Sequence, residues 1–290
     1  WGEYLVACAT TDGKAYEWQL DLNTPAAQIT NAPVDNVGII VSNERHLICL
    51  GAGGNKRKVQ WSDQENNTVW TPSANNLAGD LELETSGRIR TARRVGNDIL
   101  IWTDVDCHLM RYLGPPFVYG IERVGTDCGV VGPNSVVVSG NTAVWLSESG
   151  FWIYDGSIKP LQCDALLDVT DGINSVQGAK VFGGHNSQFG EAWWFYPSSG
   201  SNINDRYVIY DYKEGHWSIG QLDRSAGFDA GVFSAPIWFN SNGTMYDHET
   251  NYEYGEYIPY AETGPIILTN DIVKVNEVIP DEKTQGYQSF

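Results

Sequence analysis

A short strand–turn–strand phrase that ends in aromatic residues recurs six times along this chain of 290 residues. The marker positions of the successive phrases lie 36 to 56 residues apart, at Tyr16, Gln60, Tyr112, Tyr154, Tyr210 and Tyr246. Repeats of about 40–50 residues built from short strands are typical of the blades of a β-propeller. We therefore predict an all-β fold in which residues 1–258 form about six propeller blades.

Four hairpins can be placed from runs of β-branched and aromatic residues that are separated by Gly, Asn, Ser or Asp. Their paired strands are predicted at 99–103 with 108–112, 143–146 with 151–154, 192–196 with 207–212, and 236–239 with 244–246. The apolar residues scarcely alternate with polar ones, so we expect these strands to be buried on both faces. Helical periodicity is weak, and the best stretch, residues 166–176, predicts at most a short turn.

The series of strand–turn–strand phrases ends near Gly255. Residues 259–290 contain two further strand-like runs, so we expect them to begin a second β element, with a soft boundary between Tyr254 and Thr263. Because the chain starts at Trp1 within a strand-rich region, we expect the natural protein to extend upstream. No run of 18 apolar residues and no basic, apolar leader occurs, so we expect neither a transmembrane helix nor a signal peptide.

Aromatic residues are abundant and the chain is strongly acidic. Eleven Trp, fifteen Tyr and nine Phe accompany only two Met, which favours rigid aromatic packing between sheets. The formal net charge is −18, and residues 201–290 contain fourteen acidic residues against five basic ones. Such a surface repels free nucleic acid on average. Two interpretations stay open: the acids serve solubility alone, or they line a passage along which DNA slides without sticking.

No cofactor or metal site is predicted. The five cysteines are scattered, contain no Cys-x-x-Cys pair, and are interpreted as small buried side chains in a reducing compartment: Cys8, Cys49, Cys107, Cys128 and Cys163. Residues 104–106 and 168–171 offer oxygen ligands, but neither group completes a calcium loop. A phosphate-binding loop requires Gly-Lys followed by Ser or Thr, but in the glycine-rich residues 51–56 Asn55 separates Gly54 from Lys56. A hairpin tip is therefore the better interpretation.

Signals of catalysis are weak. The five histidines are scattered, and neither Gly-x-Ser-x-Gly nor His-Glu-x-x-His occurs. Residues 61–70 resemble the Asp-box turn of sialidase propellers, but Glu65 stands where that motif requires Gly. Adjacent Trp193 and Trp194 could stack on sugar rings, although such pairs more often pack on two neighbouring sheets. We expect no enzyme, and we keep a glycan-binding or glycan-cleaving propeller as the alternative function.

Basic residues form two clusters in this acidic chain. Together the clusters hold seven of the eighteen basic residues: Lys56, Arg57, Lys58, Arg88, Arg90, Arg93 and Arg94. Clusters of this kind can contact an acidic partner subunit or DNA phosphates. They can equally be solvated runs that pair with nearby carboxylates.

Two phrases and a hairpin give the chain a resemblance to a known family. They are Pro115-Pro116-Phe117-Val118-Tyr119-Gly120, Cys128-Gly129-Val130-Val131-Gly132-Pro133-Asn134, and the hairpin that ends in Tyr154-Asp155-Gly156. Residues 60–63, 186–191 and 279–286 add similar phrases. In order and layout the chain resembles the tail nozzle, or hub, of short-tailed bacteriophages, which is also described as a packaged-DNA stabilisation protein. That family offers no catalytic residues to carry over.

The resemblance implies a structural virion protein of the phage tail that is assembled in the host cytoplasm and does not insert into a membrane. Such subunits form a ring, usually of six copies, below the portal and adaptor proteins. Spikes or fibres and a needle or plug attach to the ring, and double-stranded DNA leaves through its channel. We expect an acidic lining of that channel, effective within a Debye length of about 8–10 Å, to include Glu253, Glu256, Glu262 and Asp281. We expect the seven clustered basic residues at contacts with neighbouring subunits or the adaptor.

Overall fold

The computed structural model describes residues 1–250. The second β element predicted at 259–290 lies outside the described residues, and so do Glu253, Glu256, Glu262 and Asp281. Within the described part, strands dominate, and the helical segments are α1 (Leu166–Gly172) and two 3-10 turns at Ala52–Gly54 and Ser175–Lys180. None of these helical segments is long and apolar enough to cross a bilayer.

The strands form six antiparallel sheets, each a meander of consecutive strands. Blade 1 contains β1 (Leu5–Cys8), β2 (Ala15–Trp18) and β3 (Ala27–Gln28). Blade 2 contains β4 (Gly38–Val41), β5 (Leu47–Leu50), β6 (Lys58–Trp61) and β7 (Gly79–Glu82). Blade 3 contains β8 (Ile89–Val95), β9 (Asp98–Thr103), β10 (Cys107–Gly114) and β11 (Val118–Gly125).

The remaining three blades follow the same order. Blade 4 contains β12 (Val136–Ser139), β13 (Thr142–Ser147), β14 (Gly150–Tyr154) and β15 (Ile158–Leu161). Blade 5 contains β16 (Phe182–Asn186), β17 (Glu191–Tyr196), β18 (Arg206–Asp211) and β19 (His216–Gly220). Blade 6 contains β20 (Ala226–Phe228), β21 (Ile237–Phe239) and β22 (Met245–Asp247). The two terminal blades therefore have three strands, and the four between them have four.

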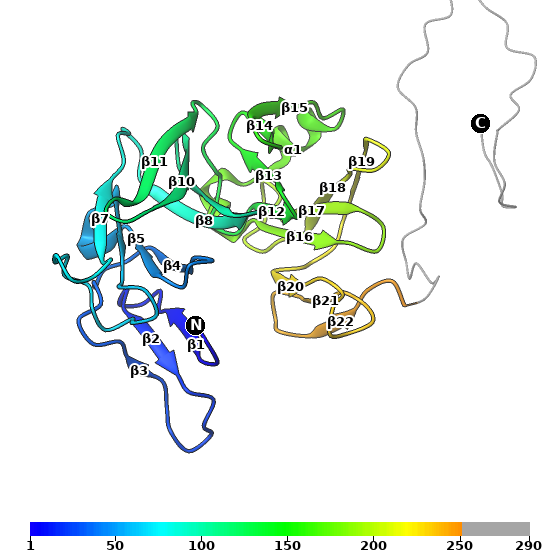
Figure 1. The fold of residues 1–290 in the computed structure, drawn as a ribbon. Helices are drawn as coiled ribbons and strands as arrows, with labels where there is room; N and C mark the ends of the chain where they lie inside the picture. The colour runs from blue at the N-terminus through cyan, green and yellow to red at the C-terminus, as the bar shows by residue number, and fades with distance from the viewer. Residues whose placement is uncertain (251–290) are drawn as a thin grey trace, which may run out of the picture. The chain divides into compact units, whose positions relative to one another are not determined.

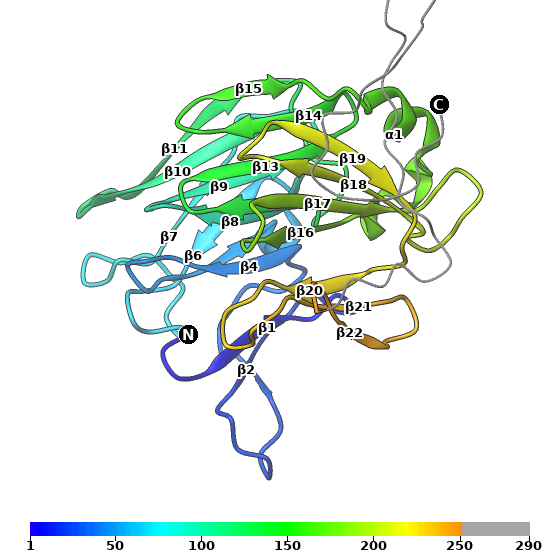
Figure 2. The same ribbon diagram turned by 90° about the vertical axis from the view of Figure 1, so that its right-hand side faces the viewer.

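The first strands of successive sheets contact one another in chain order, from β1 through β4, β8, β12 and β16 to β20. Each sheet continues outward from this inner strand, so the sheets are the blades of a propeller (Figure 1 and Figure 2). The predicted fold class, an all-β propeller with about six blades, is confirmed. Within residues 1–250, no contact of comparable extent joins β20 back to β1.

The local predictions are confirmed in most details. The four predicted hairpins are present as β9–β10, β13–β14, β17–β18 and β21–β22. The short turn expected at residues 166–176 is present as α1. The marker positions of blades 2–6 lie on the third strand of each blade, at Gln60, Tyr112, Tyr154, Tyr210 and Tyr246. The first marker, Tyr16, lies on the second strand of blade 1, so the repeat is out of phase there.

Four tryptophans on the second strands of blades 3–6 form the centre of the core. None of them is more than 1% exposed: Trp102, Trp145, Trp194 and Trp238. The indole of Trp145 packs edge-on against Trp102 of the preceding blade, with ring centroids 5.4 Å apart. Its Nε1 donates to the carbonyl of Cys128 at 2.8 Å, so the ring also bonds the segment that connects the two blades. Aromatic pairs of this kind add about 0.5–1.5 kcal/mol beyond the burial of their area.

Five apolar cores lie between successive blades. Trp194 belongs to the core between blades 4 and 5, and Trp193 to the core between blades 5 and 6, so these rings pack on two neighbouring sheets as expected. The core between blades 5 and 6 has only three buried residues, Trp193, Phe195 and Trp238. Among residues 1–250, no core joins blade 6 to blade 1. Packing is therefore deepest in the middle of the blade series.

All five cysteines lie in the described part and are free thiols. Cys49, Cys107 and Cys128 are buried, as expected of small apolar side chains, and the other two are half-buried. Burial raises the pKa of Cys128 to about 11 and that of Cys163 to about 12. Since the thiolate is the reactive form, these thiols are poor nucleophiles at neutral pH.

Candidate functional site

The clustered basic residues gather at the junction of blades 2 and 3. Lys56 and Arg57 precede β6, and Arg88 precedes β8. The Ile89 N–H donates to the Lys56 carbonyl at 2.8 Å, which brings Arg88 to the same end of these blades as Lys56 and Arg57, whereas Arg93 and Arg94 lie near the other end of β8. The juxtaposition is a consequence of blade packing that the sequence alone did not show.

Local carboxylates neutralise most of this basic surface. Four of the residues form ion pairs: Arg57 with Glu82, Lys58 with Asp80, and Arg88 and Arg90 with Asp104. Arg93 Nη2 donates to the Pro133 carbonyl at 3.0 Å, and Arg94 Nη1 donates to Asn43 Oδ1 at 3.2 Å, so these two link blade 3 to its neighbours. Pairing with nearby acids, one of the two interpretations of the sequence, is confirmed for four residues. The contact with other subunits stays a prediction.

A row of hydrogen-bonding side chains joins blades 5 and 6 at one end of the propeller. His185, on β16, lies with its Nδ1 2.8 Å from Asp229 Oδ2 and its Nε2 2.9 Å from the hydroxyl of Tyr212. Asp229 follows β20, and its carboxylate also accepts the N–H groups of Ser187 and Ala230. A carboxylate held in this way fixes the orientation of the imidazole.

Two glutamates meet beside that row. The buried Asn186 amide donates to Glu191 Oε2 at 3.1 Å and to Glu249 Oε1 at 3.3 Å. Burial, and next to it the charge of Glu191, raises the pKa of Glu249. The Trp193 Nε1 donates to Glu191 Oε2 at 2.9 Å. Asn186 therefore joins two carboxyl groups, and the one on Glu249 holds its proton more tightly than an ordinary glutamate does.

The Asn186 side chain is only 1% exposed, and its Oδ1 has no hydrogen-bond partner. The sequence does not reveal this group of side chains, because its members lie at the ends of five different strands and have no regular spacing along the chain. The family-like phrase at residues 186–191 is the one sequence feature that includes members of this group, Asn186 and Glu191. Among residues 1–250, no group of His, Cys, Asp and Glu side chains is arranged to hold a metal ion.

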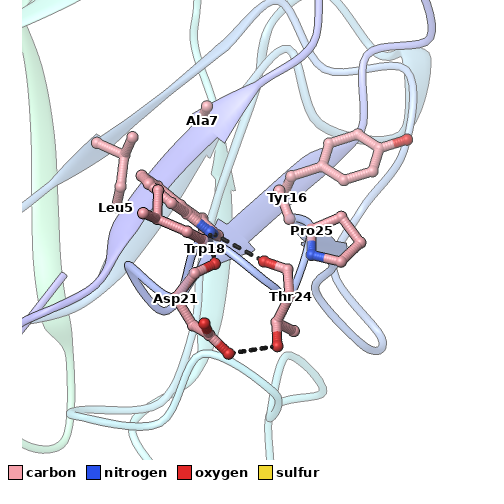
Figure 3. A pocket seen from close by; sticks show the side chains of 9 residues that line it. Leu5, Ala7, Tyr16, Trp18, Asp21, Thr24 and Pro25 are labelled. Carbon is pink, nitrogen blue, oxygen red and sulfur yellow. Dashed lines mark hydrogen bonds between the residues drawn. The ribbon is translucent and has the colours of Figure 1, made fainter.

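An apolar hollow of about 390 Å³ lies on blade 1 (Figure 3). Leu5 pairs with Trp18 and Ala7 with Tyr16 across β1 and β2, so these four side chains share the face of the sheet that points away from blade 2. The rest of the lining comes from the loop that follows β2: Asp21, Leu22, Thr24, Pro25 and Ala26.

Hydrogen bonds hold the loop that forms the rim of the hollow. The Trp18 Nε1 donates to the carbonyls of Asp21 and Thr24 at 2.9 and 3.0 Å. The Thr24 hydroxyl donates to the Asp21 carboxylate at 2.6 Å, and this bond, with one from the Asn23 N–H, lowers the pKa of Asp21. The hollow is thus a preformed feature with an apolar floor of sheet residues, rather than a gap in a loose loop.

No protein-family model matches the chain, and no curated protein has a matching sequence. Solved structures do share its fold. A chain of the Saccharomyces cerevisiae complex of a Dbp5 variant bound to Nup159, a Gle1 variant, IP6 and ADP is 10% identical, with a TM-score of 0.53, over 85% of this chain and 70% of that one.

Two further structures are similar at the same level. The N-terminal domain of Nup159 is 12% identical, with a TM-score of 0.51, over 85% of this chain and 71% of that one. The dihydro-haem d1 dehydrogenase NirN, in complex with DHE, is 12% identical, with a TM-score of 0.51, over 86% of this chain and 52% of that one. At such low identity these likenesses support the propeller fold alone.

Proposed function

We propose that the protein is a structural component of a virion, the tail nozzle of a short-tailed bacteriophage. Copies form a ring, of six by family resemblance, that extends the tail channel, retains packaged DNA and conducts it during ejection. Its partners are the portal and adaptor proteins, tail spikes or fibres, and a needle or plug. DNA passes without sequence-specific binding, repelled by a lining that includes Glu253, Glu256, Glu262 and Asp281.

The observation that carries this proposal is the place of the family-like segment 128–134 in the fold. This segment connects blade 3 to blade 4. The N–H groups of Cys128 and Gly129 both donate to the Val105 carbonyl at 3.1 Å, and the Val131 N–H donates to the Leu146 carbonyl at 3.1 Å. The phrase that resembles the nozzle family therefore helps to bond two central blades together, which suits a protein that must keep its shape under the pressure of packaged DNA.

Sizing by light scattering tests the proposal. The full chain is measured alone and with a portal–adaptor complex. We expect the mass of a closed ring in at least the second condition. A protein that remains a single copy under both conditions would contradict the function.

Charge reversal tests the predicted role of the basic clusters. Arg57→Glu combined with Arg88→Glu is expected to weaken ring assembly or adaptor binding. Lys159→Glu is the matched control, because Lys159 also forms a surface ion pair, with Asp155 at 2.6 Å, but lies on blade 4. Assembly that is equally unaffected by both changes would place the subunit contact elsewhere.

A glycan-cleaving propeller is the second candidate, and the carboxyl pair Glu191 and Glu249 favours it. Glycoside hydrolysis uses two carboxyl groups, one of which has a raised pKa, as Glu249 has here. If this candidate holds, the protein releases reducing sugar from bacterial surface polysaccharide, and Glu249→Gln abolishes the release. Glu214→Gln, a change at an exposed turn of blade 5, is the control. Absence of any release by the unmodified protein would exclude it for that substrate.

A further inference from the structure

Blade 6 carries an apolar tip in the connection between β20 and β21. Val232 is 99% exposed, and Phe233 and Phe228 are about half exposed. The two phenylalanine rings pack together with centroids 5.8 Å apart, and the Gly231 N–H donates to the Phe233 carbonyl at 3.0 Å. Residues 230–245 contain no charged side chain and no histidine. Asp229, next to Phe228, is the one charged residue of the connection, and its carboxylate is bonded to His185 and to the N–H groups of Ser187 and Ala230. The tip is therefore a convex, apolar projection that costs free energy while water covers it.

The hollow on blade 1 has the complementary character. Its floor is apolar, and Leu22 at its rim is 92% exposed. Asp21 is the one charged residue of its lining, and the bonds from Thr24 and Asn23 already satisfy that carboxylate. An apolar side chain can enter the hollow without stripping water from an unpaired charge.

We infer that the hollow on blade 1 receives the blade 6 tip of a neighbouring copy, and that this is the contact that builds the proposed ring. The inference rests on the proposed function. A convex patch and a concave patch on one molecule make a head-to-tail contact, and such contacts generate closed rings when the rotation between copies allows it. Both patches lie in the compact unit Trp1–Thr250. Within the residues that the structure describes, no other part of the same chain covers either patch.

Charge favours these two patches over the rest of the surface. Each copy carries a net charge of −18, so most ways of bringing two copies together place like charges opposite one another. The hollow and the tip reduce that repulsion because each has a single acid, Asp21 and Asp229, and both carboxylates are already bonded within their own chain. The paired basic residues at the junction of blades 2 and 3 would attract a second acidic copy only weakly, because nearby carboxylates already neutralise most of their charge.

Disulfide trapping between copies tests the inference. In a background of Cys8→Ser and Cys163→Ser, one preparation carries Leu22→Cys and another carries Val232→Cys. The two positions are so exposed that folding tolerates the changes. We expect the mixture, after mild oxidation, to give a cross-linked dimer several times more abundant than in either preparation alone. Leu167→Cys mixed with Val176→Cys is the control, because both positions are also exposed, at 74% and 88%, but lie outside the two patches.

Two results would overturn the inference. The first is a mixture that cross-links no better than the control pair. The second is a chain carrying both Leu22→Cys and Val232→Cys that closes a disulfide within itself while the mixture gives none, because the tip would then dock inside one copy.

Light scattering separates this contact from the proposed function. Val232→Asp should weaken ring assembly by at least about tenfold, because the contact would bury an unpaired charge. If the unmodified protein forms a ring and Val232→Asp leaves the ring intact, the function stands and the contact is wrong. If the unmodified protein forms no ring even with the portal–adaptor complex, the function fails instead.

Discussion

The central and terminal blades of this propeller are built from the same hairpins but packed to different depths. The second strands β9, β13 and β17 of blades 3–5 are almost wholly buried, whereas β2 of blade 1 is half-buried. In blade 6 the second strand, β21, is buried, but the strands on either side of it, β20 and β22, are largely exposed. Each central blade also has a neighbour on both faces. The difference suggests that the central blades make the propeller rigid, and that the terminal blades offer exposed surface for contacts with other molecules.

Replacing one tryptophan in each region should give the largest contrast. Trp145→Ala removes a fully buried ring that packs on Trp102 and bonds Cys128, and we expect it to lower the free energy of unfolding by about 3–5 kcal/mol. Trp18→Ala removes a half-buried ring at the hollow and should cost about 1–2 kcal/mol. Urea denaturation followed by circular dichroism measures both. Equal costs would show that the terminal blades are packed as firmly as the central ones.

Two glycines repeat the contrast at the backbone. A Cβ on Gly129 would lie 2.2 Å from the backbone carbon of Asp104, so Gly129→Ala forces the connection between blades 3 and 4 apart and should cost about 1–3 kcal/mol. A Cβ on Gly231, in the blade 6 tip, meets nothing within 4 Å. Gly231→Ala should therefore be neutral or stabilise by up to about 1 kcal/mol. A destabilising Gly231→Ala would mean that the tip is already packed against something.

The two regions also differ in how far the sequence predicted them. In the central blades each hairpin is a local object, because its strands and its turn are adjacent in the chain, so patterns of apolar and turn residues suffice. In blade 1 the marker Tyr16 fell on the second strand instead of the third, because short strands with few apolar residues leave the register undetermined by local pattern.

The functional candidates were harder to predict for a related reason. His185, Asp229 and Glu249 belong to segments that meet only when blades 5 and 6 pack, so no fixed spacing announces them. The hollow likewise depends on the pairing of Leu5 with Trp18, which sets four apolar side chains on one face. The basic clusters were visible in the sequence, but their carboxylate partners were not, since those partners lie on β7 and in the turn that follows β9.

Acidification should weaken blade 6 in particular. Burial, and next to it the charge of Arg224, lowers the pKa of His248 from 6.5 to about 4, and the Arg224 Nε donates to the His248 Nε2 at 2.9 Å. The unfolded chain then binds this proton more readily than the folded one, so stability is full above about pH 6.5 and falls as the pH drops toward 4. His248→Gln keeps an acceptor for Arg224 and should flatten this decline, as measured by urea midpoints across that pH range.

Acidic residues titrate in part of the same range, so the informative quantity is the difference between the two pH profiles. His216→Gln is the matched control, because His216 is an exposed histidine at the start of β19. We expect its profile to follow that of the unmodified protein. If His248→Gln and the unmodified protein decline in parallel from pH 6.5 to 4, His248 does not couple protonation to the packing of blade 6.

Removal of a surface ion pair should change the free energy of unfolding by a similarly small amount in the central and the terminal blades. Arg88→Gln breaks a 2.8 Å pair with Asp104 on central blade 3, and Lys14→Gln breaks a 3.9 Å pair with Asp12 on terminal blade 1. Both pairs are exposed to water and salt, so we expect each change to cost no more than about 1 kcal/mol. Urea denaturation at low and high salt measures them, and high salt should shrink both effects. If Arg88→Gln instead cost as much as Trp145→Ala, the firmness of the central blades would come from charge at the blade ends. The buried tryptophans would then be secondary, and blade packing could not be what separates the middle of the propeller from its ends.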